Sequence, residues 1–319
     1  VHALSKKFDR VTVITGQAGI NNDSPNVKVI DTQWIAGQSF RNVVRLIVKS
    51  LPLIIRGDFN SVFFHMTDLQ CALLSPFIRL RGKRQLLWYA HTSKSNYLLW
   101  SSCWVNSIIT STPGSCPIKS EKVLPIGQAI DESRFAEISL EMLNLNKLIH
   151  IGRFDKSKQI ETLIQAAIEL REDNNQIELK LVGSPANEES EIWAQGLIAK
   201  YRNQIELGWL EFEGSIPRAH FPVKMAKSGC FFHAYTGSLD KTLVESTMLC
   251  VPVVTINPEY INIFGSWSNS GPVSLTSEYR ALTSLSNFDL RSELDRRHLL
   301  ALRNHSLTNW VDQLTQLLK

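Results

Sequence analysis

The sequence has few cysteines and no long hydrophobic run. The five cysteines lie far apart and none forms a Cys-x-x-Cys pair, which excludes a disulfide scaffold and favours a reducing compartment. No apolar run reaches about 18 residues, and residues 1–10 lack the apolar core of a signal peptide, so we expect neither a membrane span nor export. The sequence therefore predicts a cytoplasmic protein.

Glycine and proline are too few for a collagen-like or low-complexity chain. The 319 residues include 16 Gly and 12 Pro, with 44% hydrophobic and 20% charged residues, a balance that excludes disordered and coiled-coil classes. At about 150 residues per domain, the length favours two domains, each able to bury its own core.

Acidic residues are scarce in the first part of the chain. Residues 1–125 hold 15 basic and 6 acidic residues, hence a net charge of +9, and the remaining 19 basic and 24 acidic residues give −5. This asymmetry suggests that the first lobe meets an anionic membrane or nucleic acid, the alternative being ordinary solvated charge. No basic and aromatic module or zinc pattern supports nucleic acid, so we expect no such partner.

Short apolar runs alternate with helical patterns, as in parallel α/β folds. In the first half, strands are predicted at residues 10–15, 27–30, 61–64, 85–89, 107–110 and 122–124, and helices at 39–55 and 69–80. We expect Pro52 to kink or end the first of these helices.

The second half repeats this alternation. Strands are predicted at residues 147–151, 177–182, 210–212, 230–234 and 252–256, and helices at 157–171, 186–201, from 217, at 240–249 and in two segments within 289–319. Such an order predicts a doubly wound parallel sheet. We expect a first lobe at 1–125, a linker at 126–146, a second lobe at 147–288, and C-terminal helices at 289–319 that return toward the first lobe.

Two predicted turns between a strand and a helix carry residues suited to a nucleotide. Gly152 and Arg153 follow one strand, and Lys158 lies near the start of the next helix. Ligands bind at the carboxyl edge of such sheets, where a helix N-terminus favours anions, so Arg153 and Lys158 could serve a diphosphate. The alternative is that both are solvated surface residues.

The second turn precedes a predicted helix that contains Glu245. A buried Glu245 could accept hydrogen bonds from the two hydroxyls of a ribose. The alternative is an exposed Glu245 paired with Lys241, four residues earlier.

Together these segments resemble glycosyltransferase family 4, the retaining nucleotide-sugar transferases of the GT-B fold. The resemblance is carried by residues 124–135 (LPIGQAIDESRF), Gly152-Arg153 with Lys158, 181–183 (LVG), 212–214 (FEG) and 245–254 (ESTMLCVPVV). The first lobe is similar only loosely, through residues 88–91 (WYAH) and Phe64-His65.

The resemblance implies an α/β protein with two Rossmann-like, doubly wound lobes facing each other across a cleft. It implies transfer of a sugar from a nucleotide sugar, UDP- or GDP-linked, to a glycan or lipid-linked acceptor, with retention at the anomeric carbon. Arg153 and Lys158 would stabilise the departing diphosphate and His91 would lie near the transferred sugar. The other substrate-binding residues would be Glu245, Gly237, Ser238, Leu239, Asp240, Lys241, Gly152, Gly183 and His65.

The sequence lacks an Asp-x-Asp tripeptide, so we expect no metal and no bound cofactor in the transfer step. It departs from the family in two ways. Gly237 stands where the family has a Glu, so either Asp240 or backbone amides replace that contact, or binding of the sugar is altered. The strand and Gly-rich loop that begin the family's first lobe have no counterpart, so we expect that lobe to lack its central strand.

These departures also fit a non-catalytic accessory protein that binds nucleotide sugars, and the same architecture fits a nucleotide-sugar epimerase. The family implies a role in polysaccharide, lipopolysaccharide or glycolipid assembly. A basic stripe predicts peripheral binding to the cytoplasmic face of an anionic membrane; it comprises Arg41, Arg45, Lys49 and Arg56 with Arg79, Arg81, Lys83 and Arg84. The alternative is a helix that packs its apolar stripe on the sheet and leaves its charges in water.

Overall fold

The computed structural model describes residues 1–19, 24–268 and 271–319 and divides the chain into two compact units. The first unit comprises Val1–Ala129 with Leu307–Lys319, and the second comprises Ile130–Ser306. The expected linker at 126–146 is therefore shared between them. None of the helices in the described ranges has the length and hydropathy that a membrane crossing requires.

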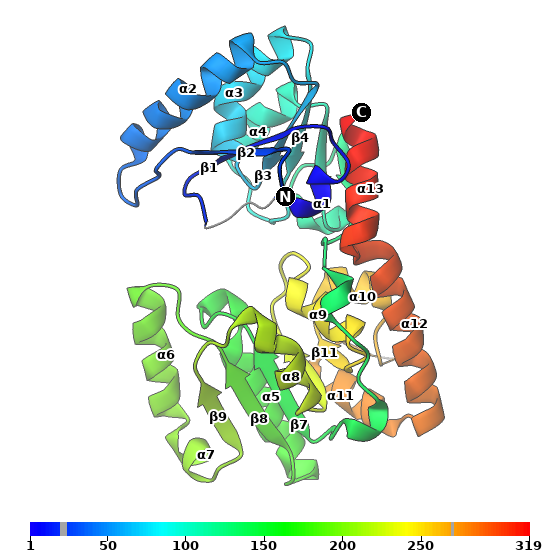
Figure 1. Ribbon diagram of the computed structural model, residues 1–319. Helices are drawn as coiled ribbons and strands as arrows, with labels where there is room; N and C mark the ends of the chain where they lie inside the picture. Colours follow the sequence, from blue (N-terminus) through cyan, green and yellow to red (C-terminus); the bar gives the residue numbers. More distant parts are fainter. Residues whose placement is uncertain (20–23, 269–270) are drawn as a thin grey trace. The chain divides into compact units, whose positions relative to one another are not determined.

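A single five-stranded parallel sheet forms the second unit (Figure 1). Its order is β11-β10-β7-β8-β9, so the chain winds outward from β7 in both directions, as predicted for a doubly wound sheet. The strands lie close to their predicted positions: β7 Lys147–Ile151, β8 Glu178–Val182, β9 Leu210–Glu213, β10 Cys230–His233 and β11 Val253–Thr255.

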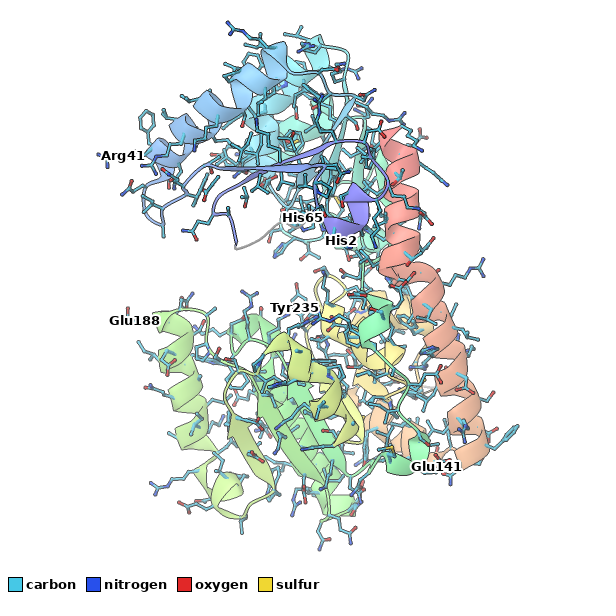
Figure 2. All side chains as sticks on the ribbon, viewed as in Figure 1. His2, Arg41, His65, Glu141, Glu188 and Tyr235 are labelled. Carbon is cyan, nitrogen blue, oxygen red and sulfur yellow. The ribbon has the colours of Figure 1, made fainter. Side chains whose placement is uncertain are left out.

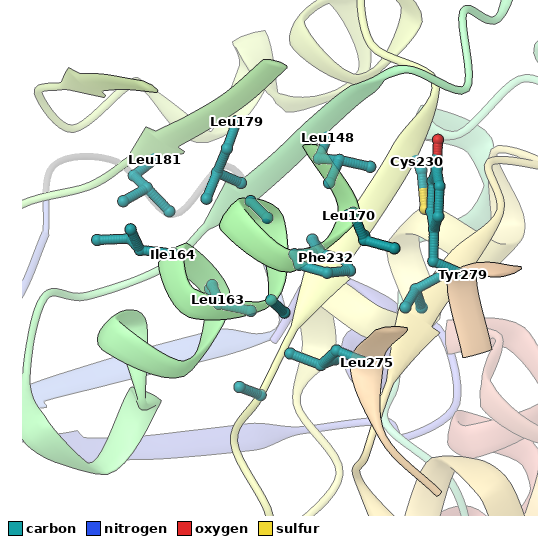
Figure 3. Close-up of a cluster of buried hydrophobic side chains, with 14 of the residues drawn as sticks. Leu148, Leu163, Ile164, Leu170, Leu179, Leu181, Cys230, Phe232, Leu275 and Tyr279 are labelled. Carbon is teal, nitrogen blue, oxygen red and sulfur yellow. The ribbon is translucent and has the colours of Figure 1, made fainter. Parts of the chain in front are cut away.

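Hydrophobic cores cover both faces of this sheet. Successive side chains of a strand point to opposite faces, so Leu148 and Phe232 join one core (Figure 3) while Ile149 and Phe231 join the other. The helices that complete the cores are α5 Ile160–Asp173, α6 Glu188–Lys200, α7 Arg202–Glu206, α8 Phe221–Ala226, α9 Lys241–Met248, α10 Pro258–Phe264, α11 Leu275–Ser284 and α12 Asn287–His305.

Three of these helices, α7, α10 and α11, were not predicted, and α5 begins later than the expected residue 157. A short 3-10 turn at Lys156–Lys158 precedes α5, and Gln159 between them is left-handed with φ of 52°. The left-handed residue separates the turn, which carries Lys158, from the helix.

The first unit contains two parallel sheets. β1 (Val11–Thr15) pairs with β2 (Val27–Asp31), and the other strands follow chain order as β3 Ser61–His65, β4 Arg84–Trp88, β5 Ser107–Thr110 and β6 Val123–Pro125. Among the described residues, no ladder joins β1 or β2 to the four-stranded sheet.

Helices from both ends of the chain cover the four-stranded sheet. α2 (Ser39–Arg56) and α3 (Asp68–Leu80) pack in one core, and α13 (Leu307–Leu318) packs in the other through Trp310 and Leu314. The short α1 (His2–Ser5) contacts α13, and α4 (Asn96–Trp104), which was not predicted, contacts α3.

Pro52 lies inside α2 and does not end it, so of the two expected effects, a kink or an end, the end is wrong. The helix continues to Arg56, because Ile54 is buried in the core and Arg81 donates hydrogen bonds to the carbonyls of Ile54 and Ile55. Packing and this cap outweigh the one backbone hydrogen bond that a proline removes.

Candidate functional site

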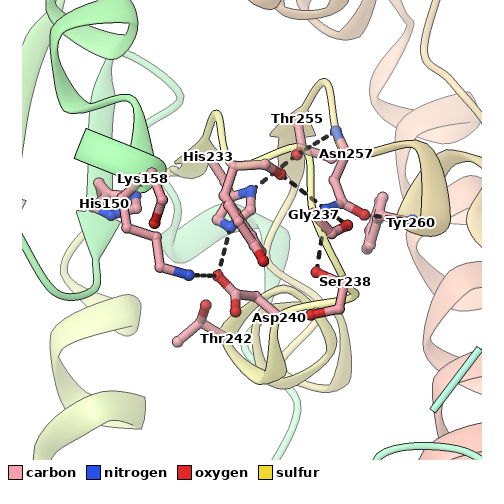
Figure 4. Close-up of polar contacts among 12 residues, drawn as sticks. His150, Lys158, His233, Gly237, Ser238, Asp240, Thr242, Thr255, Asn257 and Tyr260 are labelled. Carbon is pink, nitrogen blue, oxygen red and sulfur yellow. Dashed lines mark hydrogen bonds and ion pairs between the residues drawn. The ribbon is translucent and has the colours of Figure 1, made fainter. Parts of the chain in front are cut away.

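Polar side chains gather where β7, β10 and β11 end (Figure 4). In a doubly wound sheet the chain leaves the middle strand in opposite directions, so the connections diverge and leave room at the carboxyl edge. Lys158 follows β7, His233 ends β10 and Thr255 ends β11, while Asp240 is the residue before α9.

Lys158 is buried between an acid and an aromatic ring. Its Nζ lies 2.5 Å from Asp240 Oδ2 and 3.9 Å from the centroid of the Tyr235 ring. The ion pair and the contact with the ring face fix the position of the Lys158 Nζ at the carboxyl edge of the sheet. Lys158 is therefore not the solvated surface residue of the alternative.

A chain of hydrogen bonds orients Asp240. His233 is fully buried, and its Nε2 lies 3.0 Å from Asp240 Oδ2 while its Nδ1 lies 3.1 Å from Thr255 Oγ1. The Thr255 hydroxyl in turn accepts a hydrogen bond from the backbone N–H of Asn257. Because the carboxylate only accepts, we assign the proton to Nε2, which donates to Asp240, and Nδ1 accepts from Thr255.

Burial and charge set the ionisation of this pair. Burial lowers the pKa of His233 and outweighs the raising effect of Asp240, so the ring is neutral near pH 7. Burial opposes ionisation of Asp240, but the hydrogen bond from His233 and the Lys158 ammonium outweigh it and hold the pKa of Asp240 well below its ordinary value. The centre thus contains one ammonium and one carboxylate.

Two glycines allow the strand ends to approach closely. A Cβ on Gly152 would lie 2.8 Å from Nε2 of His150, a buried ring whose Nδ1 hydrogen-bonds to the Phe232 carbonyl at 3.0 Å. A Cβ on Gly183 would lie 1.8 Å from the carbonyl oxygen of Gly152. The buried His150 ring therefore leaves no room for a side chain at residue 152, and the Gly152 backbone leaves none at residue 183.

Arg153 lies beside this centre in sequence but is exposed. Its side chain is 69% accessible, and its Nε is 3.9 Å from Asp155 Oδ2. A weak pair of this kind leaves the guanidinium able to turn toward an anion.

Glu245 is buried inside α9, and its partner is Arg218 rather than Lys241. The Arg218 guanidinium donates to Glu245 Oε1, whereas Oε2 is buried without a hydrogen-bond partner among the described residues. The expected alternative of an exposed Glu245 paired with Lys241 is wrong. Burial raises the pKa of Glu245, and the nearby Arg218 only partly offsets that effect.

Tyr235 explains why residue 237 is a glycine. A Cβ there would lie 2.0 Å from the Tyr235 hydroxyl oxygen, so no side chain fits while Tyr235 covers Lys158. Asn257 Nδ2 fixes the turn by donating to the carbonyls of Tyr235 (2.8 Å) and Gly237 (3.2 Å). Asp240, the candidate replacement for a Glu at 237, is bound to Lys158 and His233.

The remaining predicted residues of the second unit differ in exposure. Ser238 is buried, and its carbonyl lies 3.4 Å from Asn257 Nδ2. Leu239 is buried in the core beneath α9, so its side chain contributes packing. Lys241 is exposed at the start of α9.

Two predicted histidines belong to the first unit. His91 is exposed after β4, and its Nδ1 accepts a hydrogen bond from the Ser93 N–H at 2.9 Å. His65, labelled in Figure 2, ends β3 and stacks on Trp88 with ring centroids 6.2 Å apart. His65 is the last residue of β3, and His91 lies three residues beyond β4, just past a strand as predicted.

Sequence reasoning missed Arg218, Tyr235, His233 and Asn257 as members of the site. Tyr235 and His233 lie within a segment that the sequence already singled out, and their closeness to Asp240 was a usable signal. Arg218 and Asn257 contact it from other segments, and no local pattern marks them.

Comparisons with known proteins bear on the family resemblance and the fold. Residues 131–262 match the family model described as Glycosyl transferases group 1, which confirms the family resemblance over that range. The comparison with curated proteins gave no match.

Several solved structures share the fold. HepE from Anabaena, in complex with UDP and glucose, matches with a TM-score of 0.74 at 14% identity, over 98% of this chain and 93% of that one. Sucrose-phosphate synthase from Thermosynechococcus elongatus matches with a TM-score of 0.72 at 16% identity, over 99% of this chain and 90% of that one. A glycosyltransferase from Rickettsia africae matches with a TM-score of 0.74 at 10% identity, over 97% of this chain and 89% of that one. The chain therefore has the α/β GT-B fold, built from two Rossmann-like units.

Proposed function

We propose that this chain, whose residues 131–262 match the glycosyl transferases group 1 family, transfers a sugar from a nucleotide sugar to an acceptor. The observation that carries the proposal is Glu245, a buried carboxylate with one oxygen that has no hydrogen-bond partner among the residues the structure describes, on the helix that begins beside the Lys158–Asp240 pair. HepE has been solved with UDP and with UDP-glucose, which favours a UDP-linked donor here, with a GDP-linked donor as the other candidate.

Glu245 would bind the ribose. Its free oxygen can accept a hydroxyl hydrogen bond, and the ribose would thereby satisfy a buried acceptor that otherwise lacks a partner. Arg218 holds the other oxygen and keeps the carboxylate charge balanced.

Lys158 and Arg153 would bind the diphosphate. The bond from sugar to phosphate breaks as negative charge develops on the leaving oxygen, and a preorganised ammonium lowers that barrier without reorganising solvent. The first amides of α9 could assist, because the Asp240 side chain turns toward Lys158 and does not cap the helix. Gly152 and Gly183 let the backbone come close to this anion.

The stereochemistry and metal requirement follow the family resemblance. We infer retention at the anomeric carbon in a hexosyltransferase that needs no cation for departure of the diphosphate. Full turnover in excess EDTA is the expected result. Loss of turnover that Mg²⁺ or Mn²⁺ restores would contradict this part of the proposal.

The acceptor would be a glycan or a lipid-linked glycan, with His91 and His65 near it, in polysaccharide, lipopolysaccharide or glycolipid assembly. The surface of α2 supports contact with an anionic membrane on the cytoplasmic side. The helix buries Leu46 and Ile54 in the core, yet it exposes a second apolar row, at helical spacing, formed by Phe40, Val44, Val48 and Ile55.

Basic side chains flank this exposed row, among them Arg41 (Figure 2). Arg81 and Lys49 of the predicted basic stripe have structural roles, since they donate to the backbone carbonyls of Ile54 and Asp31. Arg41, Arg79 and Arg84 are exposed and remain the strongest candidates for lipid phosphate contacts.

Calorimetry and turnover with matched lysine variants test the function. Lys158→Ala should weaken UDP binding by about 1.5 to 3 kcal/mol and lower turnover by about 10²-fold, because it removes a charged contact to the leaving group. The control is Lys156→Ala, two residues earlier, whose exposed side chain pairs with Glu189. Glu245→Gln should weaken the binding of every nucleotide that carries a ribose.

Equal UDP and GDP affinity in wild type, Lys158→Ala and Glu245→Gln would contradict the site assignment. Nucleotide binding that follows the prediction, without turnover on any donor, would favour the accessory-protein alternative. Interconversion of donor sugars without transfer would favour the epimerase.

A further inference from the structure

A second polar cluster lies at the other end of α9. Glu137, Cys250 and His298 bring one carboxylate oxygen, one sulfur and one ring nitrogen within 4.8 Å of one another. Across residues 1–19, 24–268 and 271–319, no other group of three His, Cys, Asp or Glu side chains has the spacing of a metal site. None of these three residues has a part in the proposed transfer reaction.

The orientation of His298 points to a cation. Its buried ring lies with Nδ1 2.9 Å from the Met248 carbonyl oxygen, so Nδ1 carries a proton and donates it. In the neutral ring, the lone pair of Nε2 then faces Glu137 Oε1 at 3.1 Å. Two acceptors at this distance repel unless a proton or a metal ion lies between them. Metal-binding histidines commonly show this carbonyl contact on their other nitrogen.

The surroundings of Cys250 also favour a cation. Cys250 lies two residues after the end of α9 at Met248, where helix carbonyls concentrate negative potential. Burial and the negative charges of Glu137 and Asp295 disfavour a charged Cys250 sulfur, whereas Arg291 acts in the opposite direction. Arg291 is itself engaged by Glu141 at 3.1 Å. A divalent ion would reverse this preference by stabilising the thiolate.

We propose that Glu137, Cys250 and His298 bind a divalent transition metal of the zinc type. Thiolate, imidazole and carboxylate are the ligands that zinc prefers, whereas magnesium and calcium prefer oxygen alone. Binding forms the sulfur–metal bond and releases the thiol proton to solvent, with water completing the coordination. The 64% exposed Glu137 side chain can move the remaining distance, because tetrahedral zinc ligands lie about 3 to 4 Å apart.

The role of this ion would be structural. Glu137 lies before β7, Cys250 follows α9 and His298 belongs to α12, so one ion would cross-link three segments of the second unit. Two of these segments already touch, because the Ile138 N–H donates to the Leu249 carbonyl at 2.9 Å. Metal binding should therefore raise thermal stability, by mass action on the folded state.

Cobalt and zinc titrations of the chelator-treated protein test the proposal. Co²⁺ should produce the near-ultraviolet absorption of a thiolate–cobalt bond in the wild type, and Zn²⁺ should displace it at one ion per chain and raise the Tm. Cys250→Gly should abolish the thiolate–cobalt absorption band and lower the affinity for Zn²⁺ at least about tenfold. Cys250 has a φ of 58°, which glycine adopts readily, so this variant should fold. His298→Gln should lower the affinity for Zn²⁺ by a similar factor.

Two variants at exposed positions serve as controls. Cys103→Ser and His220→Gln alter exposed residues of the same types and should bind both ions as the wild type does. Absence of the thiolate band in the wild type, or its persistence in Cys250→Gly, would overturn the proposal. Zn²⁺ affinity unchanged in His298→Gln would do the same, and it would identify the contact between His298 and Glu137 as a protonated ion pair.

Discussion

The two units use parallel strands differently. In the second unit one sheet reverses its order at β7, and its central side chains Phe231 and Phe232 are fully buried. In the first unit the strands form two sheets, and β1 and β2 leave Ile14 and Val29 about two-fifths exposed. The comparison shows that the candidate site belongs to the unit whose sheet has a reversal, because diverging connections there bring charged side chains together.

Charge follows the same division. Several basic residues of the first unit are exposed, among them Arg41 and Arg56 of α2 and Arg79 of α3. In the second unit, Lys158 is paired with the partly buried Asp240, and Arg218 with the buried Glu245. Exposed charge acts at long range and is screened by salt, while buried pairs fix geometry. This contrast agrees with the proposal that the first unit contacts an anionic surface and the second binds one nucleotide sugar.

The largest expected effect contrasts the two kinds of sheet. Phe232→Ala should lower the free energy of unfolding by about 3 to 5 kcal/mol, because it opens a cavity in a closed core. Ile14→Ala, in the partly exposed β1, should cost less than about 1 kcal/mol. Urea unfolding of both variants measures the difference. Equal losses would show that the sheet of β1 and β2 is packed as tightly as the second unit.

Acid should act mainly on the second unit, because its buried histidines must take up protons to unfold. His305 is buried, neither ring nitrogen has a hydrogen-bond partner among the described residues, and burial lowers its pKa to about 4. The folded pKa lies below the ordinary value of 6.5, so stability is present above pH 6.5 and is lost as pH falls toward 4. The loss should reach about 3 kcal/mol.

His305→Leu should remove that part of the acid loss. Burial also lowers the pKa of His150 to about 3, so the variant keeps a smaller acid dependence. The measurement is the free energy of unfolding at pH 7, 5.5 and 4.5, and His220→Gln, at an exposed position, should follow the wild type. A parallel profile for His305→Leu and wild type would contradict the prediction.

The smallest effect concerns the exposed surface of the first unit. Arg41→Glu with Arg79→Glu should weaken sedimentation with anionic vesicles at low salt, since each basic residue near such a surface contributes about 1 kcal/mol. High salt should weaken sedimentation of the wild type with these vesicles as well. Lys156→Glu with Arg202→Glu makes the same charge change in the second unit and is the control. Binding lost equally in both pairs would indicate a net-charge effect without a docking surface.

The sequence by itself predicted the strands and placed the main candidate site residues at strand ends and helix starts. Period-two and helical patterns are local, so every described strand was predicted, and Gly152, Lys158 and Glu245 were placed at the correct turns and helix. Short helices such as α10 and α11 escaped because a few turns carry too little periodic signal. Gln159 shows the same limit, since its left-handed backbone depends on the residues around it.

Only the tertiary structure decided which charges meet. Lys158 and Asp240 are separated by 82 residues, and Arg218 and Glu245 by 27, so no spacing along the chain reveals their pairing. The structure also assigned α13 to the first unit and carried α2 past Pro52. The local sequence pattern determines which face of a helix or strand is apolar. The partner of each buried charge depends on distant segments, because a charge removed from water needs an opposite charge or a hydrogen bond, and only the fold brings that group near.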